Sequence, residues 1–147
     1  MQINIEAVEQ AVALAFSVRE RAHAPYSGYF VGAVLVASDG SMHAGCNLEV
    51  ASYGGTICAE RHAAGSMIAA GKSQPYLCVV ATHDVTAAMP CGLCRQTLAE
   101  ISQEMRVLAV TKLPSGERVR QESSIAELLP FAFRFDPVAS GANAGKR

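Results

Sequence analysis

Two short cysteine-containing segments, far apart along the chain, constrain its fold more than any other feature. Cys58 stands alone in the first segment, and Cys91 and Cys94 form a Cys-x-x-Cys pair in the second. Three thiolate ligands leave a tetrahedral zinc ion with one open position, which is typical of a catalytic site, whereas a fourth protein ligand closes a structural site. The pattern therefore requires a fold that brings both segments to one metal ion.

The spacing within each segment predicts its local structure. Residues i and i+3 share one face of a helix, so Cys91 and Cys94 can both point at a metal from the first turn of a helix. Residues i and i+2 point apart inside a helix, so we expect Cys58 at or just before a helix start and Glu60 in the first turn. Helix N-termini lower the pKa of a thiol, which favours the thiolate form in both segments.

The charges around such a centre suggest further roles. Zn²⁺ with three thiolates carries about one net negative charge. Arg61 follows Glu60 directly and Arg95 follows Cys94 directly, so both arginines are candidates to balance that charge. Glu60 itself is not needed as a ligand, and its carboxylate can therefore carry protons.

The composition predicts one globular domain. The chain has 147 residues, half of them hydrophobic, and a net charge of −1. It lacks the basic stripe of a nucleic-acid-binding protein, an apolar run long enough to span a membrane and a signal-peptide pattern at its start. Five cysteines in metal-like spacing indicate a reducing compartment, so we expect a cytoplasmic protein. We expect the domain to cover residues 1–135, followed by a disordered tail over residues 136–147.

Hydrophobic periodicity predicts helices and strands in a mixed order. Helices are expected over residues 5–22, 58–71, 91–103 and 124–129, and strands over residues 30–37, 42–48, 76–82, 106–111 and 117–121. A strand pair followed by strands alternating with helices predicts an α/β fold, in which a mixed sheet has helices on both faces.

Local signals predict how several of these elements begin and end. Asn4 is a possible N-cap of the first helix, and Gly71 is the expected C-terminal cap of the helix after Cys58. A two-residue turn of Asp39 and Gly40 should join the first two strands as a hairpin. The short helix over residues 124–129 begins with a capping-box pattern.

Together with other short motifs, the cysteine segments resemble the cytidine deaminase family, in its short single-domain form that usually assembles as a homotetramer. The cysteine segments alone resemble the wider zinc-deaminase superfamily, in which a zinc-activated water attacks an aminated ring carbon and a non-ligand glutamate moves the protons. The narrower resemblance extends from Ala24 to Phe133 and includes five other motifs in the family's order: Ala24-Pro25-Tyr26-Ser27, Val31-Gly32-Ala33, Asn47-Leu48-Glu49, Ala51-Ser52-Tyr53-Gly54 and Leu128-Leu129-Pro130-x-x-Phe133.

The resemblance implies a three-layer α/β/α sandwich around a five-stranded sheet, with one zinc ion per subunit. It implies that Cys58, Cys91 and Cys94 are the zinc ligands, that Glu60 is the catalytic proton shuttle, and that Arg61 offsets the thiolate charge.

Further residues are implied as substrate contacts. Tyr29 matches the aromatic that packs on the pyrimidine, and Asn47 and Glu49 match the pair that holds the ribose hydroxyl groups. Tyr53 and Phe133 match residues that reach the site of a neighbouring subunit. Ala59 also belongs to the implied substrate-binding set.

The activity implied is hydrolytic deamination of cytidine and 2′-deoxycytidine to uridine and 2′-deoxyuridine, with release of ammonia, in pyrimidine salvage. The chain departs from the family's usual pattern at two places: Tyr29-Phe30 stands where a Phe-Pro pair is usual, and Val50 replaces an asparagine. The tyrosine adds a hydroxyl that needs a partner. A second enzyme hypothesis therefore stays open, namely deamination of a modified aminopyrimidine such as an N4-substituted cytidine or a nucleoside antibiotic of the blasticidin S type.

A hypothesis without catalysis also stays open. The Cys-x-x-Cys pair could be a redox pair, or His62 or His83 could complete a structural zinc site. Either alternative leaves Glu60 without a role. Cys46 and Cys78 lie in apolar segments and are expected to be inert core thiols.

Overall fold

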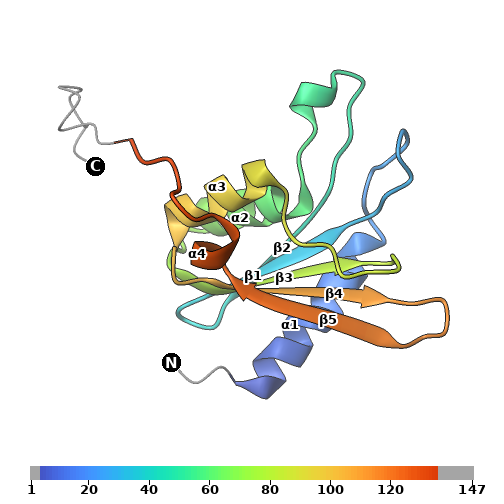
Figure 1. Cartoon of the computed structure of the whole chain (residues 1–147), viewed down its shortest axis with the longest axis horizontal. Helices are drawn as coiled ribbons and strands as arrows, with labels where there is room; N and C mark the ends of the chain where they lie inside the picture. Colours follow the sequence, from blue (N-terminus) through green and yellow to red (C-terminus); the bar gives the residue numbers. More distant parts are fainter. Residues whose placement is uncertain (1–3, 136–147) are drawn as a thin grey trace.

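A five-stranded mixed sheet runs through the middle of the molecule in the computed structural model, which describes residues 4–135 (Figure 1). Its strands are β1 (Gly32–Ala37), β2 (Met42–Cys46), β3 (Pro75–Thr82), β4 (Arg106–Lys112) and β5 (Arg118–Ser124). They lie in the order β2-β1-β3-β4-β5, and only β3 and β4 pair in parallel. The predicted mixed sheet is confirmed, whereas the tail predicted for residues 136–147 lies outside the described residues.

Helices cover both faces of this sheet (Figure 1). Helix α1 (Ile5–Arg19) packs on one face, and α2 (Ala59–Ala69), α3 (Gly92–Ile101) and the short α4 (Ile125–Leu128) lie on the other. The one-turn helix η1 (Tyr53–Gly55) precedes α2. No helix within residues 4–135 is long and apolar enough to cross a membrane.

Alternating side chains of the central strands build two separate cores. In β1, Ala33 and Leu35 belong to the core under α2 and α3, while Val34 and Val36 belong to the core under α1. Strand β3 divides in the same way. Because both faces are buried, the central strands are continuous apolar runs, as the sequence indicated.

Two glycines let helices approach the sheet closely from opposite sides. A Cβ atom on Gly32 in β1 would lie 2.0 Å from the Ala15 carbonyl oxygen of α1. A Cβ atom on Gly45 in β2 would lie 2.3 Å from the Ala63 nitrogen and 2.6 Å from the Ala59 carbonyl oxygen of α2. Gly45 therefore sets the distance between the sheet and the helix that follows Cys58.

Most of the predicted caps are present. The Asn4 side chain accepts a hydrogen bond from the Glu6 N–H (2.9 Å), and Ser124 begins α4 with a complete capping box. After α2, Gly71 has a φ of +71° and its N–H donates to the Ile68 carbonyl (2.9 Å), which is the glycine-terminated helix end that was predicted.

Two helices end earlier than predicted. Helix α1 ends at Arg19 and not near residue 22, because the Arg21 and Ala22 N–H groups donate to carbonyls three residues back, as in a tight turn. Helix α3 ends at Ile101 because Ser102 is already extended.

The predicted β1–β2 hairpin forms, but the predicted two-residue turn is wrong. The Gly40 N–H donates to the Ala37 carbonyl and the Ala37 N–H donates to the Ser41 carbonyl, both at 2.9 Å. Ser38 and Asp39 are therefore the central residues of the turn. Gly40, with a φ of +85°, is the left-handed third residue of a three-residue loop.

Candidate active site

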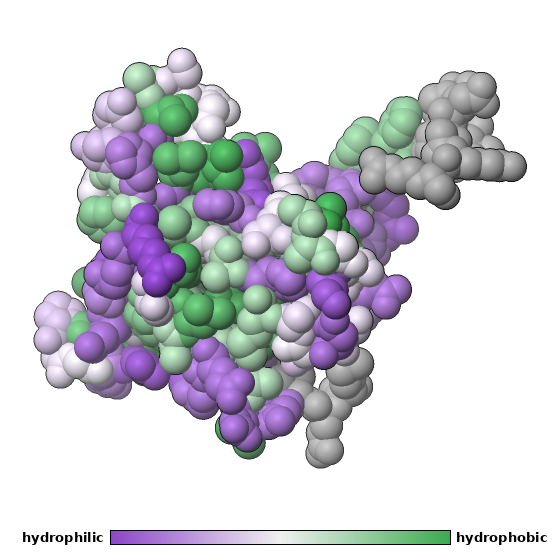
Figure 2. All heavy atoms as spheres, turned by 180° about the vertical axis from the view of Figure 1, so that it is seen from behind, coloured by the Kyte–Doolittle hydropathy of each residue, from purple (hydrophilic) through white to green (hydrophobic). Residues whose placement is uncertain are grey.

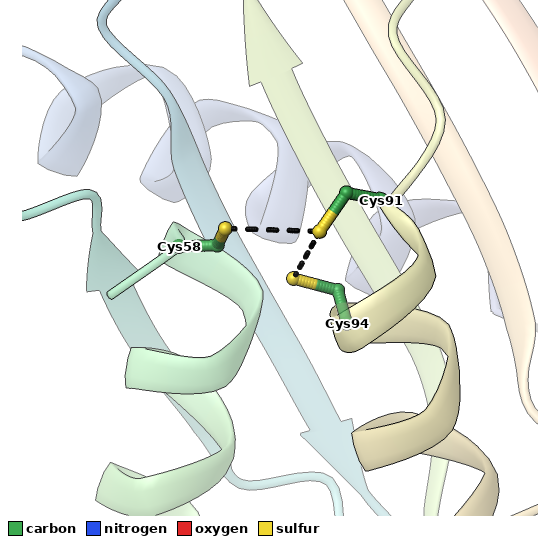
Figure 3. Close-up of side chains that lie close together, drawn as sticks. All are labelled: Cys58, Cys91 and Cys94. Carbon is green, nitrogen blue, oxygen red and sulfur yellow. Dashed lines mark hydrogen bonds between the residues drawn. The ribbon is translucent and has the colours of Figure 1, made fainter. Parts of the chain in front are cut away.

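The three predicted zinc ligands meet at the starts of two neighbouring helices (Figure 3). Cys58 is the N-cap residue of α2, Cys91 is the N-cap residue of α3, and Cys94 lies in the first turn of α3. The side chains of Cys58 and Cys91 make no capping hydrogen bond to their helices. The Cys58 and Cys91 sulfurs are 3.9 Å apart, and the Cys91 and Cys94 sulfurs are 3.6 Å apart.

These distances fit zinc. Tetrahedral coordination with Zn–S bonds of about 2.3 Å places two sulfurs about 3.8 Å apart. All three sulfurs lie within 4.8 Å of one another, and within residues 4–135 no other group of three or more such side chains forms a comparable cluster. His62 lies outside the cluster, with its Nδ1 atom 2.9 Å from the Cys46 carbonyl oxygen, and the exposed His83 pairs with the Phe16 ring. The cluster therefore supplies three ligands and leaves a fourth position open.

Mutual hydrogen bonding sets the protonation of the sulfurs in the metal-free cluster. A hydrogen bond from Cys94, helped by one from Cys91 and by the charge of Arg61, lowers the pKa of Cys58 to about 6. The pKa of Cys94 is raised, first because of its hydrogen bond with Cys58 and then because of burial. Cys58 is thus ready to bind a metal as a thiolate near neutral pH.

Glu60 lies in the first turn of α2 and is only 5% exposed. Burial raises the pKa of its carboxyl group, and the nearby Cys58 thiolate raises it further. A carboxyl group with a raised pKa exchanges protons more readily near neutral pH than an exposed one.

A cavity of about 260 Å³ opens beside this centre. Cys58, Cys91 and Glu60 line it, together with four residues predicted as substrate contacts: Tyr29, Asn47, Glu49 and Ala59. Residues from five separate parts of the chain thus surround one space.

Asn47 and Glu49 hold the loop that leads into β1. Asn47 is 8% exposed; its Oδ1 atom accepts from the Val31 N–H (2.9 Å) and its Nδ2 atom donates to the Tyr29 carbonyl (2.8 Å). Glu49 accepts hydrogen bonds from the Tyr26 and Ser27 N–H groups and from the Ser27 hydroxyl. The Ser27 hydroxyl contributes most to lowering the pKa of Glu49, so this side chain is ionised at neutral pH.

Tyr29 has polar neighbours that sequence analysis missed. Its hydroxyl lies 3.4 Å from Asp84 Oδ2, and Thr82 lines the same cavity. The sequence indicated that this hydroxyl needs a partner. No local pattern identified the partner, because Asp84 follows β3 and is distant along the chain.

Two predicted substrate contacts lie outside this cavity. Tyr53 in η1 is 70% exposed and makes an edge contact with Tyr26, at 5.6 Å between ring centroids. Phe133 is also 70% exposed, and its carbonyl accepts a hydrogen bond from Gln96 Nε2 (2.9 Å). Within a single chain, neither ring lines the cavity beside Glu60.

The two arginine candidates differ in their surroundings. Arg95 donates to two backbone carbonyls, those of Pro90 (2.7 Å) and Leu128 (2.9 Å), and so ties the Cys91 segment to α4. Arg61 contributes to the lowered pKa of Cys58. Arg95 is thus engaged by backbone carbonyls, and Arg61 stays the predicted residue for balancing thiolate charge.

Comparisons with known proteins agree with this geometry. The family described as "Cytidine and deoxycytidylate deaminase zinc-binding region" matches residues 5–111. The cytidine deaminase of Sporosarcina psychrophila is 38% identical over 136 residues, covering 92% of this chain and 97% of the relative. The cytidine deaminase of Halalkalibacterium halodurans is 40% identical over 121 residues, covering 81% of this chain and 88% of the relative.

Solved structures show the same similarity. The crystal structure of cytidine deaminase from Burkholderia pseudomallei superimposes with a TM-score of 0.78 at 38% identity, covering 85% of this chain and 98% of that chain. The cytidine deaminase from Mycobacterium tuberculosis gives a TM-score of 0.74 at 29% identity, covering 87% of this chain and 98% of that chain. The five-stranded sheet with its flanking helices is thus the architecture of these proteins.

Proposed function

We propose that this chain, which belongs to the cytidine and deoxycytidylate deaminase family, hydrolyses cytidine and 2′-deoxycytidine to uridine and 2′-deoxyuridine with release of ammonia. One observation carries the proposal: a cluster of three sulfurs at zinc spacing adjoins a cavity that two of its cysteines, Cys58 and Cys91, line together with the buried Glu60. The relatives described above, which match most of the chain, are named cytidine deaminases.

The residues divide the work between metal binding and proton transfer. Cys58, Cys91 and Cys94 would hold the zinc ion, which when bound would lower the pKa of a water molecule and so provide the nucleophile. Glu60 accepts the proton of that water, delivers it to ring N3 and then helps to protonate the leaving amino group. Its raised pKa suits a group that must both accept and release a proton.

The cavity favours a free nucleoside as substrate. One N–H of the Asn47 amide bonds to the Tyr29 carbonyl, and the amide carries a second N–H that can donate to a sugar hydroxyl. Glu49 places a negative charge at the same wall, and no lysine or arginine is among the described residues that line the cavity. A 5′-phosphate would meet repulsion without an arginine to bind it, so nucleosides should be preferred to nucleotides.

The assembly proposed is a homotetramer whose sites borrow residues from neighbouring subunits. Tyr53, Phe131, Phe133 and Phe135 are each at least 64% exposed, which is unusual for a group of aromatic side chains on a monomer. Figure 2 also shows hydrophobic residues on the surface of the lobe at its upper left. A neighbour's Phe133 or Tyr53 would close a cavity that is open in the single chain.

The cellular part of the proposal is a cytoplasmic role in pyrimidine salvage. All five cysteines are free of disulfides, as expected for a protein of a reducing compartment. Release of a reusable nucleoside and ammonia is the chemistry that salvage requires.

Turnover by the purified zinc-loaded protein tests the proposed activity. Loss of the ultraviolet absorbance of cytidine should be fast, with similar results for 2′-deoxycytidine and much slower turnover of cytosine and cytidine monophosphate. Activity confined to N4-substituted cytidines or nucleoside antibiotics would favour the modified-substrate hypothesis. Bound zinc without turnover of any of these compounds would support a structural or redox module.

Substitution of Glu60 tests the mechanism. Glu60→Gln should retain zinc while kcat falls by about 10²–10⁴-fold, the usual contribution of general acid–base catalysis. Cys58→Ala should lose metal because one of three ligands is gone, and Glu104→Gln, at an exposed position, is the matched control. A Glu60→Gln protein with near-normal kcat would exclude Glu60 as the proton carrier.

A further inference from the structure

One wall of the substrate cavity is a tyrosine ring whose far end is held by a carboxylate on another loop. We propose that Asp84 is a positioning residue, which fixes the Tyr29 ring against the bound base through the Tyr29 hydroxyl. The inference rests on the proposed nucleoside deaminase function, because that function makes the cavity a base-binding site. The Tyr29 hydroxyl distinguishes this chain from the family pattern, which has a phenylalanine at this position.

The backbone of Tyr29 is already fixed on both sides. Its N–H donates to Ser27 Oγ (3.0 Å), and its carbonyl accepts from Asn47 Nδ2 (2.8 Å). The ring is 38% exposed, so packing alone leaves it room to rotate about its side-chain bonds. A contact at the hydroxyl is therefore the element that can select one ring orientation.

Asp84 is anchored well enough to do this. Its N–H donates to Thr111 Oγ1 (2.7 Å), and the same hydroxyl donates to the Asp84 carbonyl (2.9 Å). Thr111 is fully buried in β4. The second carboxylate oxygen, Oδ1, accepts from the Val85 N–H (2.7 Å). Both the backbone and the side chain of Asp84 are thus held relative to the sheet.

Thr82, the last residue of β3, lines the same cavity as Tyr29. Thr82 is 1% exposed, and its Oγ1 atom has no hydrogen bond of ordinary geometry within residues 4–135. Thr82 opposes the rise in the pKa of Tyr29 that burial and Asp84 cause. The end of β3 therefore contributes Thr82 to the cavity, and the loop after it brings Asp84 to the Tyr29 hydroxyl.

The protonation of Tyr29 suits a donor role. Burial is the main cause that raises its pKa, and the charge of Asp84 raises it further. The phenol is therefore neutral at physiological pH and donates to the ionised carboxylate. The contact at 3.4 Å is longer than an ordinary O–H···O hydrogen bond, so its expected contribution lies at the low end of the range for one hydrogen bond.

Loss of the contact should weaken substrate binding more than chemistry. The zinc ligands and Glu60 lie on α2 and α3, and neither helix contacts the Tyr29 hydroxyl through a hydrogen bond. Asp84→Ala should therefore raise KM for cytidine by about twofold to threefold, the low end of the range for one hydrogen bond, with kcat changed less.

A double-mutant cycle in the zinc-loaded enzyme tests the assignment. Asp84→Ala should raise KM in the wild-type background and have little effect in the Tyr29→Phe background, because the hydroxyl is then already gone. Asp84→Asn should restore KM, since its amide can donate to Tyr29 while its oxygen still accepts from Val85. Val85→Ala, on the same loop and 77% exposed, is the matched control. An equal rise in KM in both backgrounds, or no rise at all, would overturn the proposal.

Urea unfolding of the same four proteins separates this proposal from the proposed function. A Tyr29–Asp84 contact predicts that the effects of the two single substitutions on the unfolding midpoint are not additive. If the wild-type protein turns over no nucleoside, the proposed function fails, and the positioning of a base fails with it. In that case, non-additive effects on the unfolding midpoint would still support the Tyr29–Asp84 contact, but not its role in binding a base. Additive effects in an active enzyme would contradict the contact itself.

Discussion

Replacement of Gly45 by alanine tests whether the approach of α2 to the sheet determines the geometry of the site. The new Cβ atom would lie 2.3 Å from the Ala63 nitrogen, whereas ordinary contacts begin at 3.4 Å. The shortfall is 3.4 − 2.3 = 1.1 Å. The obstructing atoms belong to the helix backbone and cannot rotate away, so α2 must move by about 1 Å.

This shift has two calculable consequences. Overpacking of this kind costs about 1–3 kcal/mol of unfolding free energy. Cys58 is the N-cap residue of α2 and Glu60 lies in its first turn, whereas Cys91 and Cys94 lie at the start of α3. A displacement of about 1 Å between reacting groups lowers the rate by about 10²-fold. The Gly45→Ala protein should therefore bind zinc more weakly. Its kcat should fall by about 10²-fold even under conditions in which the protein stays folded.

Urea unfolding, zinc content and kcat are the measurements. The matched control is Gly65→Ala, because Gly65 lies in the same helix and an added Cβ meets no atom within 4 Å. In Gly65→Ala, the unfolding free energy should rise by about 0.5–1 kcal/mol, because alanine has a higher helix propensity than glycine. Its kcat should stay at the wild-type value. A Gly45→Ala protein with wild-type stability and kcat would refute the argument. A destabilised protein with full kcat would show that the site does not depend on the α2–β2 distance.

Two further predictions concern the surface. Phe133→Ala should raise KM several-fold and shift the sedimentation profile toward smaller species, while the zinc content stays constant. An unaltered oligomer with an unaltered KM would contradict a role for Phe133 at a neighbour's site. Asp39 accepts hydrogen bonds from Lys72 and Ser41, which hold its pKa well below the ordinary 3.8. The stabilisation that the ionised Asp39 side chain provides is therefore present at neutral pH, and it is lost as the pH falls below 3.8 toward the lowered pKa. Asp39→Asn should lower Tm by at most a few degrees at pH 7, a difference that should narrow steadily in acid.

Much of the metal centre could be predicted because its information is local. The Cys-x-x-Cys spacing requires a helical turn, and the Cys58-x-Glu60 spacing requires a helix start between the two residues. The structure has both features. The continuous apolar runs of β1 and β3 likewise predict, from local sequence alone, that both faces of these strands are buried.

Features that depend on partners distant in the chain could not be predicted. Nothing near Asp84 in the sequence indicates that it faces Tyr29, since the two meet only when β1 and β3 pair. Gly45 reads as a weak point of a strand until the position of α2 is known.

The hairpin turn shows a third limit. The Asp39-Gly40 pair suits both a two-residue turn and a three-residue loop with a left-handed glycine. The register that pairs Val36 with Met42 decides between them, and register depends on how the whole strand packs.

Cys58 and Cys91 occupy the helix N-cap positions where serine, threonine, aspartate or asparagine is usual, yet neither side chain caps its helix. This has a consequence for the order of events during synthesis. Cys58 leaves the ribosome before Cys91 and Cys94, so the start of α2 is synthesised first. Its N-cap side chain makes no capping hydrogen bond, and its metal-binding partners at the start of α3 follow later. A zinc ion bound to all three sulfurs would link both helix starts, and it could do so only after Cys94 has been synthesised. Hydrogen exchange of the backbone amides in these two first turns should therefore slow together when zinc is added to the finished chain.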